Sequence, residues 1–254
     1  MELTIELPTA RLGAIVDALQ REGKGVGLTV QHLAWEMAAD ACRDMIKYSP
    51  PMDGGSGSFA AQRKVGEGAA EHDLDRAFAV YDEPDRLVWE FNGTHYTRRK
   101  GSRAVATIES AYWDDTAGAV QRTHLSLRNS AGRVPRQSRQ HWTKKRIFGG
   151  YVRTVKKHVG ELKAGWLEGL RRFAARTGKS ASVPAWIARH NTPSAIADNV
   201  TPEGDGAITV GNLSKDAKAI RKSQLLFVMR KRQTDADKYL ALRAEKIAER
   251  IANA

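Results

Sequence analysis

Apolar residues recur at strand or helix spacing in several separate stretches of the chain. Alternation of apolar and polar residues predicts strands near 2–7 and 86–91, and a short apolar run predicts another near 207–211. Apolar spacings of three and four predict helices over about 29–48 and 65–80. Helices mixed with a few short strands are typical of an α+β protein. We therefore predict a layer of helices packed on a small, mostly antiparallel sheet.

The same patterns favour one domain over 1–254, because the chain is long enough to bury a sizeable core. A short helix is expected around 12–19, and a helical segment is expected over 215–254. No run of 18 apolar residues occurs in the sequence, so no transmembrane helix is expected, and a membrane is not among the partners that we predict. The first residues lack the basic region of a signal peptide, which predicts a cytoplasmic protein.

A further helical pattern covers about 157–176 and contains Gly160, Gly165 and Gly169. Each glycine inside a helix costs about 1 kcal/mol relative to alanine. Gly165 and Gly169 are four residues apart and share one helix face, where missing side chains let another backbone approach. The neighbouring Trp166 can supply buried area at that contact. The other backbone could belong to a second copy or to the same chain, whereas Gly160 could simply begin the helix.

Residues 92–157 have weak periodicity and are rich in Arg, Gly, Ser and Asn, which predicts an extended basic arm. Between Asp115 and Glu161 the sequence has no acidic residue but eleven lysines and arginines. The whole chain carries a formal net charge of +12. This charge favours an acidic partner such as nucleic acid, an acidic protein surface or a membrane surface.

Aromatic residues alternate with the positive charges of this stretch. Such a pattern can bind single-stranded nucleic acid by backbone attraction and base stacking. It can equally form a protein interface, where Trp, Tyr and Arg are enriched, or remain a solvated loop. The predicted interface residues are Gly165, Trp166 and Gly169, which shape the helix contact, together with Arg136, Arg139, Trp142, Lys144, Lys145, Arg146, Phe148 and Tyr151.

The sequence offers few candidates for catalysis. The stretch 177–180 ends like a phosphate-binding loop but lacks the preceding glycine and strand. Asp114 and Asp115 could hold Mg²⁺ in a nuclease only if further carboxylates converged on them. The histidines lack the helical spacing of a metal site, and Cys42 falls on an apolar helix face. We therefore predict no enzyme activity, catalytic residue, metal or cofactor.

The order of several segments resembles the tail-completion proteins of tailed bacteriophages, also called neck or head–tail joining proteins. The resemblance extends over roughly 30–254, and the long stretch 92–157 departs from the family's pattern. The segments that carry it are 48–57, 63–78, 133–136, 159–166, 183–187 and 208–212.

This resemblance implies a structural protein of the virion, in the neck or upper tail, that is present in the host cytoplasm during assembly. It implies a ring of copies that contacts the portal or connector, the tail terminator or the tail tube, and it allows contact with packaged DNA. Two alternatives stay open from the residues themselves. One is a nucleic-acid-binding protein that uses the basic residues 122–157, and the other is a phage-encoded enzyme with an unrecognised site.

Overall fold

The computed structural model of the chain divides into two compact units, each with its own hydrophobic core. The first unit comprises Met1–Arg63 and Val159–Ala254, and the second comprises Lys64–His158. This differs from the predicted single domain, because the middle of the chain buries a separate apolar cluster. The residues described are 3–8, 30–52, 57–81, 88–91, 93–100, 103–130, 132–201, 206–235 and 238.

The first unit contains an antiparallel sheet with the strand order β1-β9-β8. Its strands are β1 (Leu3–Pro8), β8 (Ser194–Asp198) and β9 (Ala207–Asn212). The sequence predicts both β1 and β9, and the two strands pair directly. In the register of the two strands, Ile5 lies opposite Val210.

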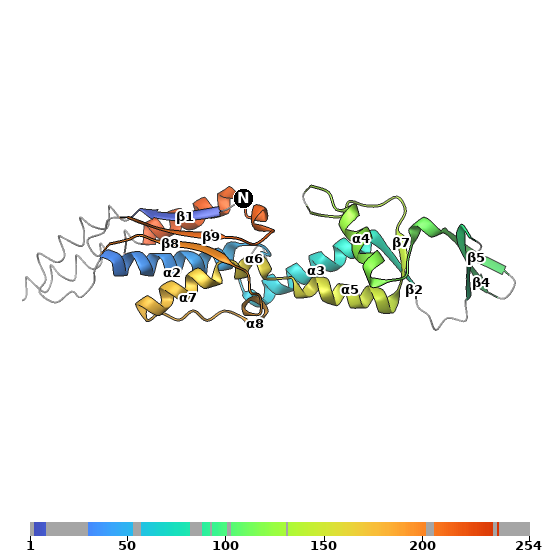
Figure 1. Ribbon diagram of the computed structural model, residues 1–254, viewed down its shortest axis with the longest axis horizontal. Coiled ribbons are helices and arrows are strands. Elements are labelled where there is room, and N and C mark those ends of the chain that lie inside the picture. The colour runs from blue at the N-terminus through green and yellow to red at the C-terminus, as the bar shows by residue number, and fades with distance from the viewer. Residues whose placement is uncertain are drawn as a thin grey trace, which may run out of the picture. The chain divides into compact units, whose positions relative to one another are not determined.

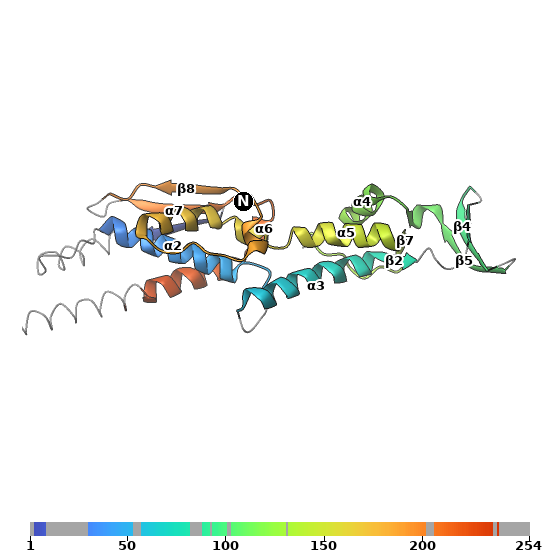
Figure 2. The ribbon, with the colours of Figure 1, turned by 90° about the horizontal axis from the view of Figure 1, so that it is seen from below.

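Helices α2 (Val30–Tyr48) and α7 (Leu167–Thr177) lie side by side next to this sheet, as Figures 1 and 2 show. On α2, Ala34, Ala38 and Cys42 recur every four residues and are buried. Their short side chains allow α7 to approach closely. The predicted α+β class, with helices packed on a small antiparallel sheet, is confirmed.

The single helix predicted over 157–176 is wrong, because the chain turns twice within this range. Helix α5 (Lys145–Lys157) ends before it, and the short helix α6 (Glu161–Ala164) precedes α7. Gly160 lies between α5 and α6 with φ of 104°, in the left-handed region that favours glycine. A Cβ atom on Gly160 would also lie 2.7 Å from the ring of Trp186. Glycine therefore marks a break in the helix here.

Gly165 and Gly169 admit close contacts inside the first unit. A Cβ atom on Gly165 would lie 2.2 Å from Oδ1 of Asn212, and one on Gly169 would lie 2.8 Å from Cγ1 of Val210. Both neighbours belong to β9, and Sγ of Cys42 on α2 is also 3.0 Å from the Gly169 position. The close approach expected from the sequence is thus within one chain. Neither glycine lines an intermolecular surface, because the protein's own core covers both.

A fully buried lysine holds the end of α2. Nζ of Lys163 donates hydrogen bonds to the carbonyl oxygens of Ile46, at 2.8 Å, and of Ser49. Carbonyl groups at a helix C-terminus lack partners within the helix and carry the negative end of its dipole. Trp166, also fully buried, donates from Nε1 to the Ser49 hydroxyl at 3.1 Å. Trp166 therefore belongs to the core and not to the interface predicted for it.

The second unit contains two separate three-stranded sheets. The parallel sheet has the order β2-β7-β6, and the antiparallel sheet has the order β3-β4-β5. The strand predicted near 86–91 therefore forms but does not join β1 and β9 in one sheet. The strands are β2 (Phe78–Tyr81), β3 (Val88–Phe91), β4 (His95–Lys100), β5 (Arg103–Glu109), β6 (Trp113–Asp114) and β7 (His141–Lys144).

Helices complete the second unit and enclose its core. Helix α3 (Phe59–Ala77) starts in the first unit and continues into the second, where α4 (Ala117–Leu127) and α5 also lie. Buried Leu74 and Val120 belong to the core cluster that these helices form. The extended arm predicted over 92–157 is therefore wrong, because much of this range is helix and strand. Strands β6 and β7 have only two and four residues, so alternation over them gives little signal.

Four described elements remain. They are η1 (Ser110–Tyr112), α8 (Ala185–Ala188), η2 (Ala217–Ala219) and a helix over 222–235. The last of these agrees with the predicted C-terminal helical segment, whereas the helix expected around 12–19 and residues 239–254 lie outside the described part of the chain. Within the described residues, no helix has the length and apolar character needed to cross a membrane.

We expect Gly165→Ala to destabilise the first unit by roughly 2–4 kcal/mol, because the new methyl group must displace a fixed side chain. Asn212 is fully buried, and its amide is held by hydrogen bonds to Leu162 and Ser214. Urea unfolding of the purified protein measures the change in free energy. Ala175→Leu, at an exposed position of α7, is the matched control and should change stability by less than about 0.5 kcal/mol. Equal effects of the two substitutions would contradict this account.

Candidate functional site

Helix α5 has one apolar face and one basic face. Phe148, Tyr151 and Val155 recur at spacings of three and four residues and pack on the core of the second unit. Arg146 and Arg153 lie seven residues apart and are exposed. The helix is therefore anchored by its apolar face, and it presents positive charge on the surface of the unit.

Acidic residues outside the acid-free stretch pair with some of its cations. The guanidinium of Arg139 is held in this way and also lies over the ring of Tyr112, 4.9 Å from its centroid. The hydrogen bond to Glu109 raises the pKa of Arg139 further above its ordinary value. These ion pairs are Arg139 with Glu109 at 2.6 Å, Arg128 with Asp73 at 3.5 Å, and Lys156 with Glu71.

Other arginines of the stretch keep their charge unpaired. Within the described part of the chain, five of them form neither an ion pair nor a side-chain hydrogen bond, and all five are exposed. Unpaired surface guanidinium groups create a positive potential that attracts anionic groups. These residues are Arg122, Arg133, Arg136, Arg146 and Arg153.

The aromatic residues of the stretch are partly buried by packing within the second unit. Phe148 packs edge-on against Phe78, with ring centroids 6.2 Å apart. Trp142 is half-buried in β7, the middle strand of the parallel sheet, and Tyr151 is half-buried against the core. Binding of single strands by base stacking requires accessible aromatic faces. The charged and aromatic residues that alternate in the sequence therefore lie at different depths in the structure. Most of the charged residues are exposed, and the aromatic residues pack beneath them.

A buried polar cluster joins α3, α4 and α5 beneath this surface. Nε2 of His124 lies 3.0 Å from Asp73, and its Nδ1 lies 2.9 Å from the hydroxyl of Tyr151. The other carboxylate oxygen of Asp73 accepts a hydrogen bond from the backbone N–H of Val134 at 2.6 Å. Burial lowers the pKa of His124, against the hydrogen bond to Asp73, and burial raises the pKa of Tyr151. The cluster fixes the helices that carry the arginines.

The two aspartates considered for a nuclease site have different environments. Asp114 is buried, accepts a hydrogen bond from Thr123 at 3.1 Å, and lies 3.0 Å from Nδ1 of His141. Asp115 is exposed. Among the residues that the structure describes, no group of three or more His, Cys, Asp or Glu side chains could hold a metal ion. Asp114 therefore has a structural role in linking β6, α4 and β7.

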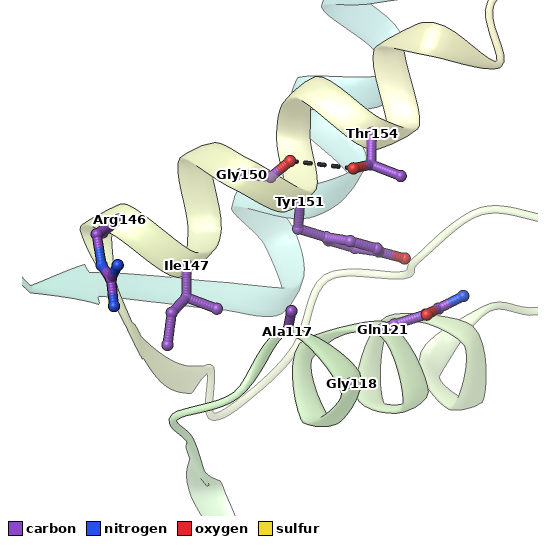
Figure 3. A pocket seen from close by; sticks show the side chains of 8 residues that line it. All are labelled: Ala117, Gly118, Gln121, Arg146, Ile147, Gly150, Tyr151 and Thr154. Carbon is purple, nitrogen blue, oxygen red and sulfur yellow. Dashed lines mark hydrogen bonds between the residues drawn. The ribbon is translucent and has the colours of Figure 1, made fainter.

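A hollow of about 410 Å³ lies between α4 and α5 (Figure 3). Ala117 and Gln121 on α4 face Ile147 and Tyr151 on α5 across it, and Arg146 stands at one end. Gly118, Gly150 and Thr154 complete its lining. The hollow combines an apolar floor with bare backbone and positive charge.

The structure brings together only part of the predicted interface set. Arg146 and Tyr151 line the hollow, Lys144 and Lys145 lie where α5 begins, and Arg136 lies in the exposed loop before β7. The sequence analysis missed Arg122, Gly150 and Arg153 as site residues. The helical spacing of positions 146, 150 and 153 was the available signal.

Comparisons with known proteins identify no relative of this chain. No family model, no curated protein and no solved structure matches it.

We expect the second unit to lose stability as the pH falls below the ordinary pKa of histidine, about 6.5. The unfolded chain binds a proton at His124 at pH values where the folded unit, with its lowered pKa, does not. The stability that neutral His124 contributes is therefore fully present above the ordinary pKa. It is lost as the pH falls toward the lower pKa that His124 has in the folded unit. Hydrogen exchange of α4 and α5 amides between about pH 7.5 and pH 5 measures the loss.

His124→Gln should flatten this pH dependence, because it removes the titrating group. His72→Gln is the matched control, since His72 is exposed on α3 and should leave the dependence unchanged. If hydrogen exchange in His124→Gln depended on pH as steeply as in the unsubstituted protein, His124 would not be the group responsible.

Proposed function

We propose that the protein is a structural component of a tailed-bacteriophage virion, without catalytic activity. In this proposal, copies form a ring at the head–tail junction and join the connector to tail proteins. The observation that carries the proposal is that the chain forms a packed first unit and a second unit whose surface carries five arginines without partners among the described residues. The order of segments that resembles tail-completion proteins gives the proposal its specific place in the virion.

The segments that carry the resemblance supply much of the first unit. The end of α2, the turn before α6, helix α8 and strand β9 all contribute to one core cluster or to its hydrogen bonds. Residues such as Trp166, Trp186 and Ile208 are buried there. Such residues support a rigid base instead of surrounding a substrate, which favours a structural role over an enzyme.

The basic surface of the second unit supports contact with other molecules. Its arginines are carried on α4, α5 and the loop before β7, all fixed by the second core. A component of a closed ring must offer surfaces to neighbours on both sides, and surfaces built on packed helices can do so with defined geometry. We propose that this surface contacts a connector or tail protein.

A nucleic-acid-binding protein is the second candidate function. The five unpaired arginines favour it, because phosphate groups would neutralise them. The partial burial of the aromatic residues counts against single-stranded nucleic acid, so duplex DNA is the form to test.

We expect the purified full-length protein to form closed rings of one copy number, because a cyclic arrangement satisfies every interface of each copy. Mass photometry and negative-stain microscopy measure this, with and without duplex DNA at low and high salt. A monomer or dimer that binds DNA and is released by salt would overturn the virion proposal.

Joint substitution of Arg122, Arg146 and Arg153 by Glu tests the basic surface of the second unit. Joint substitution of Arg171 and Arg172, which are exposed on α7, is the control.

A further inference from the structure

Glycines in the helices of this protein fall into two groups. Gly169, inside α7, has a partner at close range in its own unit. Gly149 and Gly150, inside α5, have no atom within 4 Å of an added Cβ. Glycine in a helix interior is destabilising relative to alanine, so its presence in α5 is not explained by contacts within the described chain.

Gly150 lies on the wall of the hollow between α4 and α5. Across from it, Ala117 and Gly118 form the wall on α4. These positions expose backbone or a single methyl group, so a segment resting in the hollow could approach both helices closely. Ile147 and Tyr151 supply an apolar floor beneath it.

Positive charges surround this bare surface. Arg146 lines the hollow, and Nη1 of Arg122 lies 3.5 Å from the position of a Cβ atom on Gly118. Arg153 follows Gly150 by three residues and shares its helix face. None of the three arginines has a carboxylate partner among the described residues. The missing counter-charge is the feature that identifies the occupant as acidic.

We infer that the groove between α4 and α5 binds an acidic amphipathic helix of another virion protein. Arg146 and Arg153 are seven residues apart, about 10 Å along α5, which matches carboxylates two turns apart on a helix laid alongside. Small and apolar side chains of that helix would meet Ile147 and Tyr151, in the way that helices dock in grooves. The apolar floor favours a protein segment over a phosphate backbone.

This inference rests on the proposed function, because it names the partner chemistry for the same basic surface. The probe is a synthetic helical peptide of about 20 residues, long enough to hold helical structure, with Glu two turns apart and Ala and Leu between. The same peptide with Lys in place of Glu is the control ligand. Fluorescence anisotropy measures binding to the full-length protein at low and high salt.

We expect the Glu peptide to bind at least about tenfold more tightly than the Lys peptide, with affinity that falls as salt rises. Gly150→Leu should weaken binding at least about tenfold by filling the groove, without loss of folding, because the added side chain meets open space. Gly68→Leu is the matched control, since Gly68 lies in α3 with equally open surroundings. Arg146→Glu should weaken binding, whereas Arg171→Glu should not.

Equal binding of the two peptides would overturn the inference, as would full binding by Gly150→Leu. Duplex DNA that binds better than the Glu peptide and is unaffected by Gly150→Leu would assign the surface to phosphate and also overturn it. Ring formation is measured without any peptide. Absence of peptide binding, which would contradict the groove, can therefore be distinguished from absence of ring formation, which would contradict the proposed function.

Discussion

The buried ammonium group of Lys163 ties the C-terminal end of α2 to the segment with which the chain returns to the first unit. Helix α2 ends at Tyr48, and its last carbonyl groups need donors that the helix cannot supply. Lys163 comes from the short helix that follows the second unit, more than a hundred residues later, and it supplies them. The end of α2, the Ser49 turn and the Trp166 indole then form one hydrogen-bonded core.

The second unit is built from the part of the chain between the two segments of the first unit. The segment between the exit and the return has its own buried residues, so it needs no apolar contribution from the first core. Its surface is then free to carry charge, and its polar cluster around His124 fixes the helices that present that charge. In the proposed virion role, the first unit provides rigidity and the second provides recognition.

Long periodic elements could be predicted from the sequence, whereas contacts between distant residues could not. Helix α2 and strands β1 and β9 follow directly from apolar spacing. The stretch 92–157 hides its structure because β6 has two residues, β7 has four, and α5 contains two glycines. The glycines around Trp166 correctly signal a close approach, but their partner Asn212 lies far along the chain.

Of the candidate site, only its positive charge could be predicted from the sequence. Sequence shows the absence of acids between Asp115 and Glu161, but not that Glu71, Asp73 and Glu109 return to pair with some of the cations. Likewise, nothing in the order of residues separates Phe148, which packs inward, from Arg146, which faces outward, until α5 is known to be a helix.

The pairing of β1 with β9 also orders the events of synthesis. The two strands are about 200 residues apart, so at roughly 5–20 residues per second β1 waits about 10–40 s on the ribosome for its partner. Residues 64–158 are contiguous and are complete before β8 and β9 exist. The second unit is therefore complete first, while the N-terminal strand still lacks the strand with which it pairs.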